Sequence, residues 1–88
     1  MTEAELVARW IAAADEVALL FAHEPHAKVD AELAQMRRNL IDKFCVLFPS
    51  APPEIMAAGV DCIIRSIQDR KCEIERAGAA RGGIGGRN

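Results

Sequence analysis

Residues 48–54 read FPSAPPE, and this stretch decides how the chain folds. Its three prolines cannot continue a helix, because proline lacks the amide proton and its ring clashes with the preceding turn. Ser50 can cap a following helix, and Glu54 suits its first turn, where the positive end of the helix dipole lies. The stretch therefore predicts a break between two helices.

On the N-terminal side of the break, apolar residues recur three and four positions apart, which is the spacing of one helix face. They are Val29, Leu33, Met36, Leu40, Phe44 and Leu47, with Ile41, Cys45 and Phe48 widening the face near its end. We predict a helix over residues 27–48.

Residues 22–28, AHEPHAK, precede this helix and hold both histidines. Pro25 cannot continue an earlier helix but suits the first turn of a new one. His23 and His26 are separated by this proline, whereas zinc ligands in the H-E-x-x-H motif lie one turn apart on a continuous helix. We predict a solvated turn here, with no metal and no cofactor. A metal site and a pH-sensitive histidine contact are the alternatives.

A first helix is predicted over residues 3–23. Thr2 and Glu5 form a capping box at its start, and its apolar arc covers nearly half of the helix surface. The members of the arc are Leu6, Trp10, Ile11, Ala14, Val17, Ala18 and Phe21.

After the proline stretch, a third helix is predicted over residues 53–77. Its apolar face consists of Met56, Val60, Ile63, Ile67 and Ile74, with Ile64 on the flank. Arg70 and Lys71 interrupt this face, so the packing should weaken after about residue 68. Gly78 is a helix stop of the common left-handed type, and residues 78–88 are glycine-rich and predict a flexible tail.

The 88 residues predict one all-α domain over residues 1–77, followed by the disordered glycine-rich C-terminal tail. The three helices form either a compact three-helix bundle or a helical hairpin plus a third helix. Charges interrupt every apolar run, which argues against a membrane span. The acidic N-terminus does not resemble a secretory leader, so a cytoplasmic protein with reduced thiols is expected. Cys45, Cys62 and Cys72 should each be buried or half-buried.

Catalysis is not predicted. Cys45 lies among apolar residues that would raise the pKa of its thiol, and neither Ser50 nor Ser66 stands in a nucleophile motif. The carboxylates are spread over helix faces and surround no pocket. We therefore expect a protein that is not an enzyme.

Charge is distributed unevenly along the chain. Residues 1–24 carry five acidic groups and one basic group, a net charge of −4 against −2 for the whole chain. Glu5, Asp15 and Glu16 form what we call the acidic strip. We interpret it as a face for a basic protein partner, such as a protein that handles nucleic acid. The alternative is a merely solvated face.

Several apolar residues lie outside the three predicted faces, notably Leu19, Val46 and Ile55. Together with the wide arc of the first helix, they present more apolar surface than one small bundle can bury. A homodimer is the economical explanation, and docking of a helix into another protein's groove is the rival.

Two functions from different classes follow. The first is a non-catalytic protein-binding regulator or inhibitor that occupies a partner's surface. It is similar, in size and composition alone, to phage and plasmid accessory factors, anti-CRISPR inhibitors included. The second is a small dimeric nucleic-acid-binding module that uses Arg37, Arg38, Lys43 and the tail. Direct nucleic-acid binding is disfavoured, because residues 25–49 carry four basic groups against three acidic ones.

Overall fold

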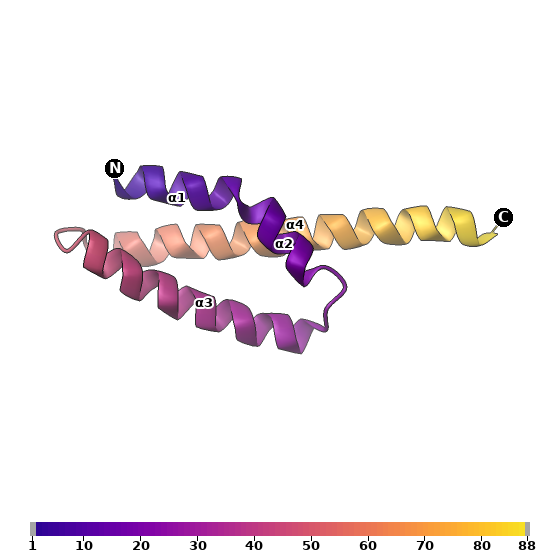
Figure 1. Ribbon diagram of the computed structural model, residues 1–88, viewed down its shortest axis with the longest axis horizontal. Coiled ribbons are helices and arrows are strands. Elements are labelled where there is room, and N and C mark those ends of the chain that lie inside the picture. Colours follow the sequence, from indigo (N-terminus) through magenta and orange to yellow (C-terminus); the bar gives the residue numbers. More distant parts are fainter. Residues whose placement is uncertain (1, 88) are drawn as a thin grey trace.

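A computed structural model describes the backbone of residues 2–87 and the side chains of residues 2–78. Four helices follow one another: α1 (Glu3–Ala12), α2 (Ala14–Phe21), α3 (His26–Leu47) and α4 (Pro53–Arg87) (Figure 1). The predicted all-α class is confirmed.

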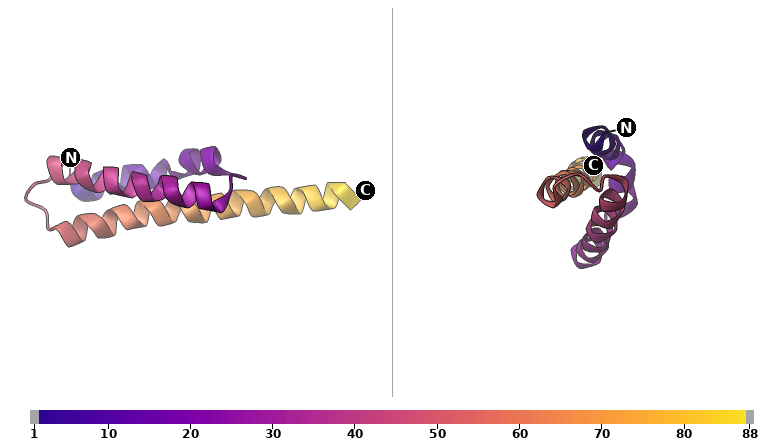
Figure 2. Two further views of the ribbon diagram at one scale, coloured as in Figure 1. Left: turned by 90° about the horizontal axis from the view of Figure 1, so that it is seen from below. Right: turned by 90° about the vertical axis from the view of Figure 1, so that its left-hand side faces the viewer.

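The helices are arranged around α4. It packs against α1, α2 and α3, whereas α1 and α2 make only marginal contact with α3. Seen end-on, α1 with α2, α3 and α4 lie at three corners (Figure 2, right). The molecule measures 59 × 24 × 16 Å, because α4 alone is about 52 Å long at 1.5 Å per residue. The molecule is therefore elongated along α4, with the other helices beside it.

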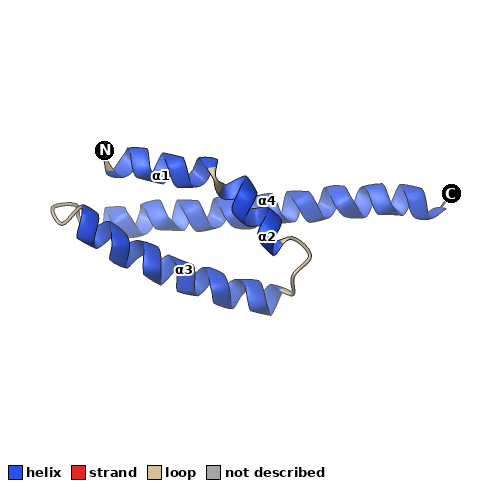
Figure 3. Ribbon diagram, viewed as in Figure 1, coloured by secondary structure: helices blue, strands red, loops and turns tan. Residues whose placement is uncertain are grey.

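The first predicted helix is divided at Ala13, so the prediction of one helix over 3–23 is wrong. Ala13 has φ −86° and ψ −2°, and its N–H is shared between the carbonyls of Arg9 and Trp10, 3.1 Å from each. The chain changes direction there (Figure 3). The bend lets α2 place Ala14 and Ala18 against α4. No proline or glycine marks the position, so packing imposes the break. At the start of α1, the Thr2 hydroxyl accepts the Glu5 N–H as predicted.

The core forms where α1, α2 and α3 meet α4, and the predicted faces supply its members. The buried residues are Ala14, Ala18, Val29, Leu33, Leu40, Phe44, Met56, Val60, Ile63 and Ile67. Leu47 and Ile11 were expected to be core residues but are exposed. The prediction that the cysteines are buried or half-buried is also wrong, because Cys45, Cys62 and Cys72 are all exposed.

The AHEPHAK segment is the connection between α2 and α3, as predicted. His23 adopts the left-handed conformation with φ 68°, which turns its backbone N–H toward α4. That N–H donates to Glu75 Oε2 at 2.6 Å, and the same oxygen accepts Lys71 Nζ at 2.6 Å. Lys71 is only 3% exposed. A residue that interrupts the apolar face of α4 in the sequence is therefore buried, and its counter-ion also holds the turn.

The third helix does not stop at residue 77. Its backbone continues as α4 to Arg87, and Gly78 does not adopt the left-handed conformation that would end a helix. Gly78 instead lies beside the His23 imidazole, since a Cβ added there would be 3.6 Å from His23 Cε1. The expected flexible tail over 78–88 is thus helical in backbone to Arg87, and the side chains of 79–88 lie outside the described residues.

The core can be tested by truncation. Replacing Leu40 or Ile63, which are 4% and 0% exposed, by alanine should lower the free energy of unfolding by about 2–5 kcal/mol. Urea unfolding followed by circular dichroism measures the change. Leu19→Ala on the exposed side of α2 is the control and should change stability little. Leu40→Ala or Ile63→Ala with the stability of the control would contradict the packing around α4.

The Lys71–Glu75–His23 contact predicts acid sensitivity. Hydrogen bonds from Lys71 and then from the His23 N–H lower the pKa of Glu75 from its ordinary 4.5. A carboxylate with a lowered folded-state pKa stabilises the fold fully above its unfolded pKa and loses this contribution as pH falls below it. The free energy of unfolding should therefore fall less steeply below pH 4.5 in Glu75→Gln than in the wild type. Asp69→Asn, which removes an exposed carboxylate from α4, is the matched control, and a Glu75→Gln slope equal to that of the wild type would contradict the contact.

Candidate functional site

The structure does not gather the six predicted partner-binding residues into one surface. Glu5 and Glu16 are exposed on α1 and α2. Leu19 and Val46 are exposed on α2 and at the end of α3, and Ile55 on the first turn of α4. Of the six residues, Ile55 is the one that lines either of the two grooves described below.

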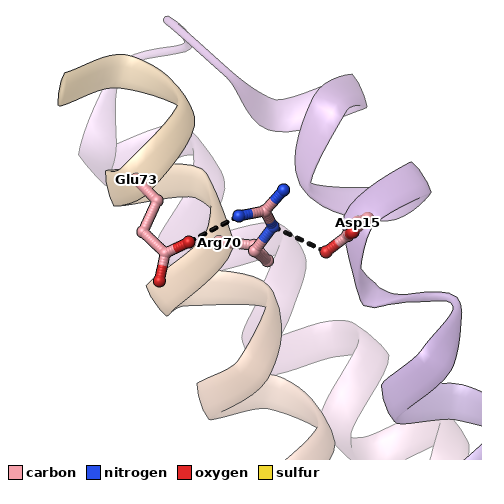
Figure 4. Close-up of polar contacts among 3 residues, drawn as sticks. All are labelled: Asp15, Arg70 and Glu73. Atoms are coloured by element: carbon pink, nitrogen blue, oxygen red, sulfur yellow. Dashed lines mark hydrogen bonds and ion pairs between the residues drawn. The ribbon is translucent and has the colours of Figure 1, made fainter. Parts of the chain in front are cut away.

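Asp15 contributes to the fold and is not a free member of the acidic strip. Its Oδ1 accepts the Nε–H of Arg70 at 2.6 Å, and the same guanidinium donates through Nη1 to Glu73 (Figure 4). Hydrogen bonds to Glu73, which has the larger effect, and to Asp15 raise the pKa of Arg70. Asp15 therefore ties α2 to α4 and is held in place by that contact. Of the acidic strip, Glu5 and Glu16 remain exposed without taking part in this contact.

The first groove, which we call the α1–α4 groove, lies between the outer sides of those two helices. It has a volume of about 440 Å³. Its lining consists of Glu3, Ala4, Val7, Ala8, Ile11, Ile55, Ala58, Gly59 and Cys62. All but Glu3 are apolar or small.

Small residues explain how this groove forms. Gly59 lets α1 approach α4 closely, because a Cβ at that position would lie 2.9 Å from Val7 Cγ2. The alanines at the groove walls do not fill the space between the two backbones. Ile11 and Ile55 remain 39% and 54% exposed on either side. The α1–α4 groove is therefore apolar and has an isoleucine on each wall.

The charge around the α1–α4 groove is negative at one end. Glu3 lines it, and Glu54 precedes Ile55 on α4, whereas Glu5 lies in the same first turn of α1 but does not line the groove. Carboxylates beside an exposed apolar furrow favour an apolar ligand that carries basic groups.

The second groove, which we call the open groove, lies between α3 and the α1–α2 segment. It has a volume of about 460 Å³ and is lined by Trp10, Phe21, Glu32, Gln35, Met36, Asn39, Leu40 and Lys43. It exists because α1 and α2 hardly touch α3. Its polar rim belongs to α3, where Gln35 donates to Asn39 Oδ1 at 3.0 Å and Arg38 donates to Gln35 Oε1 at 2.7 Å.

Sequence reasoning missed the open groove because it assigned Trp10, Phe21 and Met36 to the core. All three pack against the core but remain half-buried. The signal was the width of the apolar arc on residues 3–23, which exceeds what one neighbouring helix covers. Periodicity alone could not say which edge of the arc stays open.

The basic residues proposed for nucleic-acid binding do not form a continuous patch. Arg37 Nε donates to Asp61 Oδ1 at 2.6 Å, which lowers the pKa of Asp61. Arg38 is held by Gln35, and Lys43 lies in the rim of the open groove. Each cation thus belongs to a different local arrangement.

Within the searched residues, no three histidine, cysteine, aspartate or glutamate side chains come together as metal ligands. None of the helices in the described part of the chain is long and apolar enough to cross a membrane. Comparison with protein-family models, curated proteins and solved structures gives no match.

The close approach of α1 to α4 predicts an interaction between Gly59 and Val7. In a Val7→Ala background, Gly59→Ala should raise the free energy of unfolding by about 0.5–1 kcal/mol, because alanine favours helix over glycine. In the wild type the same substitution should lower it, since the new methyl group would collide with Val7 Cγ2. Denaturant unfolding of the four proteins measures the difference. Equal effects in both backgrounds would contradict the contact.

Proposed function

We propose that this protein is a non-catalytic protein-binding regulator or inhibitor that holds an apolar, basic helix of a partner protein in its α1–α4 groove. The observation that carries the proposal is the groove itself, with Ile11 and Ile55 exposed on its two walls. A helix docks in such a groove through apolar side chains spaced three and four residues apart.

Charge supports the same kind of partner. Glu3 lines the groove and Glu54 precedes its wall residue Ile55, while Glu5 and Glu16 add exposed negative charge on α1 and α2. Exposed carboxylates contribute little to folding stability, but they steer a basic partner and increase its association rate. The partner's helix therefore carries lysine or arginine beside its apolar face. A protein that handles nucleic acid has surfaces of this composition.

The mode of action is occupation of a surface. The chain is small, and its α1–α4 groove is lined mainly by aliphatic and small side chains, which suits packing of a partner's side chains. A bound partner would be covered over one of its own helices, and any function of that helix would be blocked. We expect this to happen in the cytoplasm, as for phage and plasmid accessory inhibitors of similar size and composition.

The test is a quantitative co-purification from the cells in which the protein is made, comparing the wild type with Ile55→Lys. Placing a charge in the groove should abolish capture of the partner and leave the circular dichroism spectrum unchanged, because Ile55 is half exposed. Glu5→Lys should slow association mainly at low salt. The matched control is Leu19→Lys, the same kind of change at an exposed position outside the groove.

The control makes the experiment decisive. A protein captured by the wild type and by Leu19→Lys, but not by Ile55→Lys, supports the proposal. Equal capture by all three forms would overturn it, and so would loss of capture in Leu19→Lys alone.

A further inference from the structure

The open groove runs along the middle of α3 and leaves the apolar side chains of Trp10, Phe21 and Met36 half-buried. Trp10 and Phe21 form one wall, and Met36 and Leu40 form the other. Further exposed apolar residues lie at the ends of α2 and α3. Leu20, next to Phe21, is 76% exposed where α2 ends, and Val46 and Leu47 at the end of α3 are 80% and 50% exposed. Three helices surround a position that a further helix would fill.

We infer that a second copy of this chain covers the open groove, with the two α3 helices antiparallel about a two-fold axis. This inference concerns a different surface from the α1–α4 groove, because the two grooves share no lining residue. It therefore does not rest on the proposed function.

Charge on the α3 rim fits a second copy. Glu32 and Lys43 both line the open groove and have opposite signs. They lie eleven positions apart, or about 16 Å along the helix. A two-fold axis midway between them places Glu32 of each copy opposite Lys43 of the other. Each copy thus supplies the acidic partner of one ion pair and the basic partner of the other, as two-fold symmetry requires.

The same register matches the apolar ends. Val46 and Leu47 lie one turn beyond Lys43 on its side of α3, since residues three and four apart share a helix face. In the antiparallel pair they meet the beginning of the other copy's α3, next to the end of α2 that carries Leu20. Met36 and Asn39 meet near the axis. The residues that are most exposed in one copy are therefore covered by the other.

The length of α3 suits a long helix–helix contact. Its 22 residues extend about 33 Å, and a standard specific interface buries about 800 Å² per partner. The centre of the open groove is apolar and its rim polar, as in such interfaces.

Charge reversal provides a test that leaves the fold intact, because Glu32 and Lys43 are both exposed. The full chain is measured by sedimentation equilibrium over a range of micromolar concentrations. The wild type should be a dimer. Glu32→Lys and Lys43→Glu should each raise the dissociation constant about tenfold or more, because each creates two like-charge contacts per dimer. Asp30→Lys, an equal charge change on α3 outside the groove, is the matched control and should remain dimeric.

Mixing the two variants separates the proposed register from any other dimer. Glu32→Lys with Lys43→Glu should form a heterodimer about as tight as the wild type, since every contact again pairs opposite charges, and the double variant should regain the homodimer. A monomeric wild type would overturn the inference and leave the groove to another protein's helix. So would single variants that dimerise as tightly as the wild type, or a mixture that does not recombine.

Discussion

Most of the packing between helices in the described part of this protein involves α4. Because α1, α2 and α3 each lie on α4 and hardly on one another, the four buried residues Met56, Val60, Ile63 and Ile67 serve all three neighbours. The next position in this series is Lys71. A buried ammonium group requires a counter-ion, and Glu75 supplies it while also accepting the His23 N–H. The end of the apolar face and the turn between α2 and α3 are thus fixed by one carboxylate.

Much of this architecture could be predicted from the sequence, because helix faces and helix ends leave local signals. The threefold and fourfold spacing around Leu33 and Leu40 predicted the side of α3 that is buried, and the prolines marked the connections. The break at Ala13 could not be predicted, since alanine favours helix and only contact with α4 bends the chain there. The burial of Lys71 could not be predicted either, because it depends on Glu75 and on a backbone amide 48 positions earlier in the chain.

The candidate surfaces were less accessible to sequence reasoning for a related reason. A helical pattern tells which residues are apolar on one side, but it does not tell how many neighbours cover that side. Trp10 and Met36 have the pattern of core residues and lie at the edge of an open groove. Ile55 was recognised because it lies off its helix face. Asp15 could not be distinguished from Glu16 in the sequence, although only Asp15 meets an arginine.

The short helix α2 is anchored in an unusual way. The residues it buries are alanines, Ala14 and Ala18, and its two ends are tied to α4 by the Asp15–Arg70 and His23–Glu75 contacts. Alanine has almost no side chain to interdigitate, so detaching α2 forfeits much less apolar burial than detaching α3. We therefore expect the segment between Ala13 and Pro25 to open as a unit of its own. Its release would uncover the buried face of α4 at a smaller free-energy cost than global unfolding.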